Sequence, residues 1–330
     1  MISRILSVFL LLVTTATAQT ASLLLVLEKG DKSLAIVDLA KQQVLARVPA
    51  GEDPHEVVVS DDGKFAYISN YGAFANPQHT ISVVDIQTHK ALPAVDLGTL
   101  RAPHGLDIAG GKVYFTAEGS KCIGRYDPAT HTVDWTLGVG QDRTHMLFVT
   151  RDASRIFTSN VNSGTISVLD RDKSGDASGW IENAIPVGKG PEGFDVSPDG
   201  KELWAANSHD GTVSIIDIAS KAVTQTVESH TKSVNRLKFT PDGKRVLMSD
   251  IGSGDLVVLD AASRSEVKRI NLGKGVAGIQ VAPDGSAAYV AVSPDSNVAV
   301  VDLKTFSVTG RIATGKGPDG MAVVPPKARQ

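Results

Sequence analysis

Three histidines and one glutamate recur at comparable places in this sequence and could carry chemistry. His55, His104 and His145 each precede a short apolar run, and Glu192 takes the same place in a later copy of the pattern. Imidazole and carboxylate groups bind zinc, copper or iron, and histidine is the usual general base near neutral pH. No H-x-x-H spacing links these residues, so any joint site depends on the fold that positions them.

The elements that must position them form a repeated unit, seen clearly from Lys189 to Ser229. Two apolar runs flank Ser-Pro-Asp-Gly-Lys at 197–201, a third run ends at Asp217, and a fourth spans 222–227. An Asp-Gly pair between two apolar runs is a strong signal for a β-hairpin. The unit therefore predicts four short antiparallel strands, the content of one propeller blade.

The unit recurs along the chain. Seven apolar runs close on an aspartate, at intervals of 42 to 47 residues: Asp38, Asp85, Asp127, Asp170, Asp217, Asp260 and Asp302. We therefore predict an all-β fold, a single seven-bladed β-propeller over residues 19–330. Residues 22–48 align with 201–227 and residues 317–325 align with 190–198, so the last blade should be closed by the N- and C-terminal strands together.

In a propeller, the residue that enters the first strand of a blade lies at the same end of the channel as the residue that leaves the second. His55, His104, His145, Glu192 and Asp319 fall at such entries, so we expect them around one arc of the channel mouth. They would line a ligand pocket, or His55, His104, His145 and Glu192 would hold one divalent transition metal. The remaining alternative is that they only cap loop backbone and face water.

Three arginines lie beside these entries: Arg101, Arg143 and Arg236. The planar guanidinium fork pairs with carboxylate or phosphate, so they are candidate ligand-binding residues for an anion, with plain surface arginine as the alternative. An insertion that carries Tyr71, Phe74 and His79 should overhang the same mouth and is a candidate lid.

The N-terminus indicates export. Arg4, the apolar run 5–13 and Ala16-Thr17-Ala18 resemble a secretory signal cleaved after Ala18, which predicts a periplasmic or secreted protein with no membrane span after cleavage. A net charge of −3 and a single cysteine, Cys122, give no argument for nucleic acid or for an internal disulfide. We expect a monomer.

Common catalytic motifs are missing from the sequence. It has no G-x-S-x-G, no P-loop and no H-E-x-x-H. Its three G-x-G-x-x-G matches begin at Gly188, Gly273 and Gly315, where each would link two blades rather than open a helix, so nucleotide binding is not expected. These observations favour a binding protein over an enzyme.

The repeat resembles the YVTN-type propellers, which are related to the lactonase-like propellers. The resemblance rests on Tyr-Ile-Ser-Asn at 67–70, Phe-Thr-Ser-Asn at 157–160, Trp-Ala-Ala-Asn at 204–207 and Val-Ser-Ile-Ile-Asp at 213–217. It implies an exported binding or scaffold protein that recognises a small ligand or a protein partner at the channel mouth. The alternatives it implies are a lactonase-like hydrolase, with or without a metal, and more distantly a propeller that binds modified haem through a histidine.

Overall fold

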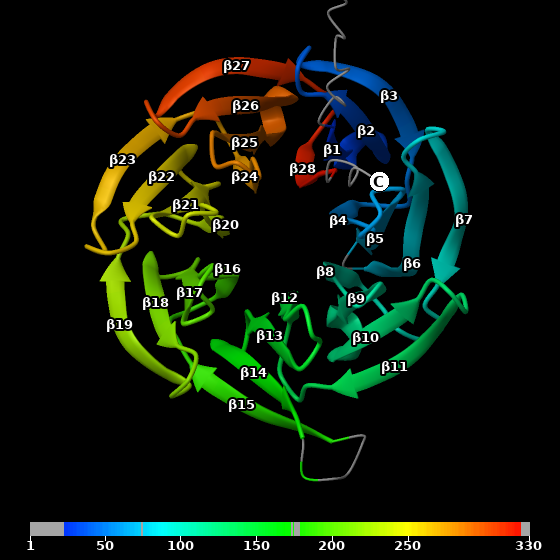
Figure 1. Cartoon of the computed structure of the whole chain (residues 1–330), viewed down its shortest axis with the longest axis horizontal. Coiled ribbons are helices and arrows are strands. Elements are labelled where there is room, and N and C mark those ends of the chain that lie inside the picture. The colour runs from blue at the N-terminus through cyan, green and yellow to red at the C-terminus, as the bar shows by residue number, and fades with distance from the viewer. Residues whose placement is uncertain (1–22, 74, 173, 175–178, 325–330) are drawn as a thin grey trace, which may run out of the picture.

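The computed structural model describes residues 23–73, 75–172, 174 and 179–324. In these residues, 28 strands form seven four-stranded antiparallel sheets arranged around a central channel (Figure 1). Helical structure in the described ranges is limited to three 3-10 turns of three residues each. The predicted all-β, seven-bladed propeller is confirmed.

Blade one comprises β4 to β7, the following blades take four strands each, and blade seven comprises β28 and β1 to β3. The innermost strands are β4 (Pro54–Val59), β8 (Pro103–Ala109), β12 (Thr144–Val149), β16 (Pro191–Val196), β20 (Val234–Phe239), β24 (Val276–Val281) and β28 (Pro318–Val323). The second strands are β1 (Leu23–Glu28), β5 (Phe65–Ala73), β9 (Lys112–Ala117), β13 (Arg155–Asn160), β17 (Glu202–Asn207), β21 (Arg245–Asp250) and β25 (Ala287–Val292).

The third strands are β2 (Ser33–Asp38), β6 (Asn76–Asp85), β10 (Cys122–Asp127), β14 (Thr165–Arg171), β18 (Thr212–Asp217), β22 (Asp255–Asp260) and β26 (Asn297–Asp302). The outermost strands are β3 (Gln43–Pro49), β7 (Lys90–Asp96), β11 (Thr132–Gly138), β15 (Trp180–Pro186), β19 (Ala222–Glu228), β23 (Glu266–Asn271) and β27 (Ser307–Ala313).

Burial follows the layer in which a strand lies. In β17 every residue after Glu202 is buried, because both faces of a second strand pack against neighbouring blades. In the outermost strand β11, exposed and half-buried residues alternate, which is the period of a strand with one face in water. Between blades four and five, Trp204 packs edge to face against Phe239, with the ring centroids 5.6 Å apart.

The ring closes as predicted. β28, from the C-terminal part of the chain, pairs antiparallel with β1, and the partners include Leu24 with Val323 and Val26 with Met321. In Figure 1 the red β28 lies beside the blue β1 at the inner edge of blade seven. This pairing covers the edge of β1 that would otherwise face the channel, and it gives blade seven the same four strands as the other blades. The predicted signal peptide, residues 1–18, lies outside the described residues.

Close packing at the channel depends on glycine in some inner strands. A Cβ added to Gly278 would lie 2.0 Å from the carbonyl oxygen of Asp319 in the next blade, and one added to Gly320 would lie 2.3 Å from that of His55. Real Cβ atoms do not approach so closely, so these positions admit no side chain without movement of the backbone. The inner strands of neighbouring blades therefore touch through their backbones.

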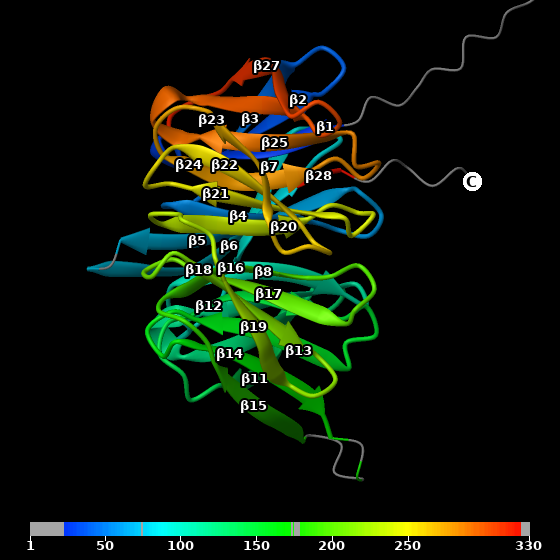
Figure 2. The same ribbon diagram turned by 90° about the vertical axis from the view of Figure 1, so that its left-hand side faces the viewer.

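The blade-one insertion extends two strands into a hairpin, with Gly72 paired to Pro77 and Ala73 to Asn76. The tips of β5 and β6 project beyond the other strands in Figure 2. Phe74, one of its predicted lid residues, lies outside the described residues. In the described part of the chain, no helix has the length and apolar character needed to cross a membrane.

Candidate functional site

The second residue of every innermost strand lies at the same end of the channel, which we call the histidine mouth. Going round the ring, these residues are His55, His104, His145, Glu192, Asn235, Ala277 and Asp319. The strand pairing skips a residue next to each of them, as between Pro54 and Val57 in β4. Such bulges re-aim side chains, which is how one short strand directs successive residues toward the channel.

The three predicted histidines His55, His104 and His145 lie next to one another, with their rings tilted. The ring centroids of His55 and His104 are 4.1 Å apart, and those of His104 and His145 are 3.7 Å apart. The Nε2 atom of His145 lies 3.6 Å from the Oε1 atom of Glu192. The structure therefore brings together the four residues proposed from the sequence as metal ligands, from four consecutive blades.

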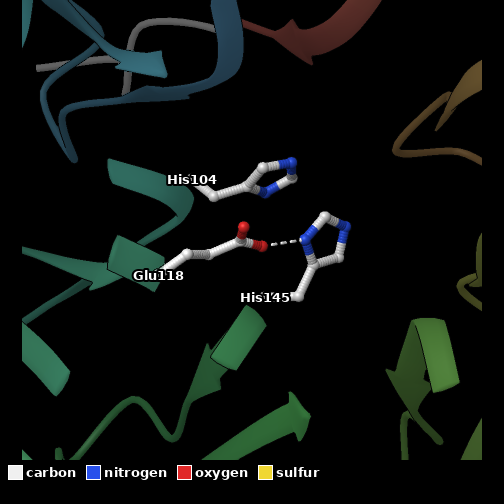
Figure 3. A group of neighbouring side chains, drawn as sticks. All are labelled: His104, Glu118 and His145. Carbon is white, nitrogen blue, oxygen red and sulfur yellow. Dashed lines mark hydrogen bonds and ion pairs between the residues drawn. The ribbon is translucent and has the colours of Figure 1, made fainter. Parts of the chain in front are cut away.

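Glu118 joins this group and was not predicted. It directly follows β9 and its side chain is 5% exposed. One carboxylate oxygen pairs with Nδ1 of His145 (Figure 3), and the other accepts a hydrogen bond of 2.6 Å from the hydroxyl of Tyr71. His104, Glu118 and His145 each offer a ligand atom within 4.8 Å of those of the other two.

The environment separates the protonation states of the two buried imidazoles. Burial, with nearby positive groups, holds the pKa of His104 well below 6.5, so this ring is neutral at neutral pH. Burial acts in the same direction on His145, but the carboxylates of Glu118 and Glu192 outweigh it and raise its pKa. The pKa of Glu192 is lowered to about 2, because the ion pair with His145 outweighs burial.

Several buried polar atoms of this group have no hydrogen-bond partner among the described residues. They are both ring nitrogens of His104 and the Nε2 atom of His145. A buried polar group without a partner costs about 1–3 kcal/mol, so native proteins seldom keep three together without a use for them. Neutral His104 can donate an electron pair to a metal ion or accept a hydrogen bond from a ligand.

Lys29 ties the closing strand to the mouth. It follows β1, and its Nζ atom lies 2.9 Å from Nδ1 of His55. The same atom lies 3.2 Å from a carboxylate oxygen of Asp53 and 3.4 Å from one of Asp319. Asp319, proposed as a ligand residue, is therefore engaged in an ion pair at the mouth.

A signal for the missed residues exists in the repeat. At an equivalent position near the end of each second strand, one backbone N–H bonds to the loop that enters the inner strand, as Glu118 does to Ala102 and Tyr71 to Asp53. Lys29, Tyr71 and Glu118 occupy this equivalent position in blades seven, one and two. A search for chemistry-bearing residues at this position would have found Lys29 and Glu118, whereas Tyr71 was already predicted as part of the lid.

The three predicted arginines have different surroundings. Arg101 donates to the carbonyl oxygens of Gly98 and Leu100 in its own loop, and no described contact joins it to the histidines. Arg236 is buried and pairs with Glu56 across the channel. The Nε atom of Arg143 lies 3.8 Å from Glu118, so Arg143 is the arginine that borders the group.

The Glu56–Arg236 pair divides the channel. Both residues also line a cavity of about 430 Å³ on the far side from the histidines, together with Asp107, Asp195 and Lys238. Burial raises the pKa of Asp107 there to about 6. The carboxylates of Asp107 and Asp195 accept hydrogen bonds from the backbone N–H groups of Val149 and Phe239 in the next blades, so they join neighbouring inner strands.

Comparison with known proteins gives a family match over part of the chain. A family model described as the cytochrome D1 heme domain matches residues 144–283, which include His145, Glu192 and Arg236 but not His104 or Glu118. No curated protein sequence matches the chain.

Solved structures match nearly the whole chain. A proposed 6-phosphogluconolactonase from Bacteroides fragilis NCTC 9343 is 17% identical, with a TM-score of 0.77 over 94% of this chain and 99% of that one. The dihydro-heme d1 dehydrogenase NirN is 15% identical, with a TM-score of 0.67 over 91% of this chain and 74% of that one. Kuenenia stuttgartiensis hydrazine synthase is 21% identical, with a TM-score of 0.69 over 81% of this chain and 88% of that one.

These likenesses support the predicted YVTN-type or lactonase-like propeller. At such identities they establish the fold, and one fold hosts unrelated functions. The function has to be argued from the histidine mouth itself.

Proposed function

We propose that this chain is a binding protein that holds a divalent transition metal ion at the histidine mouth, through His104, Glu118 and His145. The observation that carries the proposal is buried His104, whose two ring nitrogens have no partner among the described residues. Its pKa lies well below 6.5, so the metal meets a neutral imidazole and displaces no proton from it. Glu118 adds the charged ligand that a divalent ion favours.

The neighbours of this trio fit a support role. Tyr71 donates to Glu118 and thereby orients the carboxylate, as residues behind metal ligands commonly do. Glu192 lies 3.6 Å from the Nε2 atom of His145, so a further carboxylate lies beside the three proposed ligands. The proposed ligands are therefore His104, Glu118 and His145. His55 and Glu192, which were proposed as ligands from the sequence, lie beside this trio.

A single ion suits the mouth better than a haem macrocycle. The rings of His55 and His145 both lie close to the ring of His104, at centroid distances of 4.1 and 3.7 Å. A macrocycle on His104 would have to displace these neighbouring rings. The partial match to the cytochrome D1 heme domain nevertheless makes haem the control ligand to be tested.

Hydrolysis of a lactone is a second candidate function. A carboxylate paired with one nitrogen of a histidine orients the ring as a general base, and Glu118 stands in this relation to His145. A neighbour in fold is a proposed 6-phosphogluconolactonase. A binding role remains our first proposal, because it rests on the two unpartnered ring nitrogens of buried His104.

The test is a calorimetric titration of chelator-treated protein with zinc, copper(II) and nickel chlorides at neutral pH. We expect one site per chain, weakened at least about tenfold by His104→Ala or Glu118→Gln. His89→Asn is the matched control, since His89 is exposed in a turn of blade one at the other end of the propeller. Equal affinity in all variants, or no binding, would reject the metal site. A Soret band after haem addition, with no metal binding, would favour the haem alternative, and turnover of a lactone panel would favour the hydrolase.

We further propose that the chain is exported, that cleavage follows Ala18, and that the mature protein is a monomer. Edman sequencing of the secreted or periplasmic protein and light scattering after gel filtration test these points. A mature N-terminus at Met1, or a dimeric mass, would contradict them.

A further inference from the structure

A second cavity opens beside the proposed metal site, between the blade-one hairpin and blades two and three. Its volume is about 400 Å³, which lies within the range of small-molecule sites. Its wall includes Tyr71, Ala73, Pro77, Ala102, Glu118 and Arg143. Two of these, Tyr71 and Glu118, also belong to the group around His145, so the cavity and the metal site share a wall.

Arg143 supplies the cavity with a positive charge that the described residues leave available. Its Nε atom lies 3.8 Å from Glu118, and neither Nη atom has a hydrogen-bond partner in the described part of the chain. The other two arginines of this region are engaged, Arg101 by carbonyl oxygens of its loop and Arg236 by Glu56. A free guanidinium fork matches the two oxygens of a carboxylate.

The other charged side chains at the cavity do not occupy the Nη atoms of Arg143. Asp142 lies on the wall, but it is paired with Lys121 at 3.1 Å and accepts from Asn162 at 3.3 Å. Glu118 pairs with His145, accepts from Tyr71 and lies 3.8 Å from the Nε atom of Arg143, so the two Nη atoms of Arg143 remain for a ligand. The carboxylate of a ligand can therefore form an ion pair with Arg143.

Three small apolar residues of the wall favour an apolar body, and Gly119 and Asn162 complete the wall. Ala73 and Pro77 come from the blade-one hairpin and Ala102 from the loop before β8. Small apolar side chains gain from contact with hydrocarbon and offer nothing to a polar ligand. Ala73 and Pro77, from the insertion proposed from the sequence as a lid, thus supply part of the apolar side of the cavity.

We propose that this cavity binds a small organic acid, with the carboxylate on Arg143 and the apolar body against Ala73, Pro77 and Ala102. The inference deepens the proposed function by naming the class of ligand beside the metal, and its coupling to the metal rests on that function. Glu118 provides the coupling, because the metal site and Arg143 share its carboxylate.

The experiment is a calorimetric titration of chelator-treated and zinc-loaded full-length protein with benzoate. We expect saturable binding, weakened about tenfold or more in Arg143→Gln because a charge-assisted pair is lost. Arg101→Gln is the matched control and should bind benzoate as the wild type does. Benzamide, which lacks the charge, and acetate, which lacks the apolar body, should each bind at least about tenfold more weakly.

The outcomes separate the two proposals. Benzoate binding that is unchanged in Arg143→Gln, or absent from the wild type, would overturn the organic-acid site even if zinc binds. Phosphate binding as tight as benzoate would overturn the apolar selectivity. Benzoate binding without any zinc binding would leave the organic-acid site standing and reject the metal site.

Discussion

Glu56 and Arg236 form an ion pair across the central channel, although they lie 180 positions apart in the sequence. The pair joins blade one to blade five, and its side chains are 14% and 5% exposed. It separates the histidine mouth from the cavity on the other side. The histidines and that cavity therefore lie on opposite sides of a buried charged pair.

Breaking that pair should destabilise the protein. Glu56→Gln leaves the buried guanidinium of Arg236 without its main partner, which costs about 3 kcal/mol. The double variant Glu56→Leu with Arg236→Leu should recover most of this loss, because no unpaired charge remains. Urea unfolding measures the free energies. The exposed pair Lys244–Asp242 is the control, and Asp242→Asn should cost less than about 1 kcal/mol; equal costs at the two sites would contradict the account.

The protonation of His104 should lower the free energy of unfolding in acid. Its pKa is lowered well below 6.5 in the folded protein, so the unfolded chain takes up a proton first as the pH falls. This contribution to stability is complete above pH 6.5 and is lost below it. As the pH drops below 6.5, the free energy of unfolding should therefore fall less in His104→Leu than in the wild type. Asp107, whose raised pKa of about 6 acts in the opposite direction, is present in both proteins and does not affect this difference.

The control for this pH effect is His89→Asn, which should follow the wild type. Glu192, with its pKa lowered from 4.5 to about 2, adds its own loss only at lower pH. An identical pH profile in His104→Leu and wild type would refute the assignment.

Tyr71 should act on metal affinity without being a ligand. Its hydroxyl donates to Glu118, so Tyr71→Phe frees the carboxylate to rotate and should weaken zinc binding about tenfold. Tyr126→Phe is a matched control, since that buried hydroxyl contacts His131 and should leave zinc affinity unchanged. Parallel calorimetric titrations decide the point, and equal affinities in the two variants would show that Tyr71 has no such role.

Removal of the closing strand should open the ring. A chain that lacks residues 317–330 loses β28, its pairing with β1 and buried Met321. We expect its Tm to fall by at least about 5 °C, because burial of one methionine alone contributes about 2 kcal/mol. A chain that lacks only residues 325–330 keeps the strand and should melt like the wild type. An unchanged Tm in the longer deletion would contradict closure by both termini.

The sequence was sufficient to predict the ring, because each unit repeats the same turns and apolar runs. It also placed His55, His104 and His145 correctly, since equivalent positions in equivalent blades must meet around one axis. The ladder pairing of β28 with β1 followed from the same alignment.

Other parts of the site could not be predicted from this alignment. Glu118 occupies a position that other blades fill with Lys29, Tyr71 or Val161, so its residue type does not repeat and only a search of that position across the blades would find it. The Glu56–Arg236 pair depends on how far two long side chains reach across the channel, which the alignment of units does not specify. Arg101 was proposed beside Arg143, but its own loop carbonyls take up its guanidinium.

The most direct test of the metal site is an anomalous difference map from a crystal of the full-length protein grown with zinc. The account predicts a peak about 2.0–2.2 Å from a nitrogen of His104, a nitrogen of His145 and an oxygen of Glu118. A map with no peak at these three residues, in a crystal that shows them ordered, would contradict it.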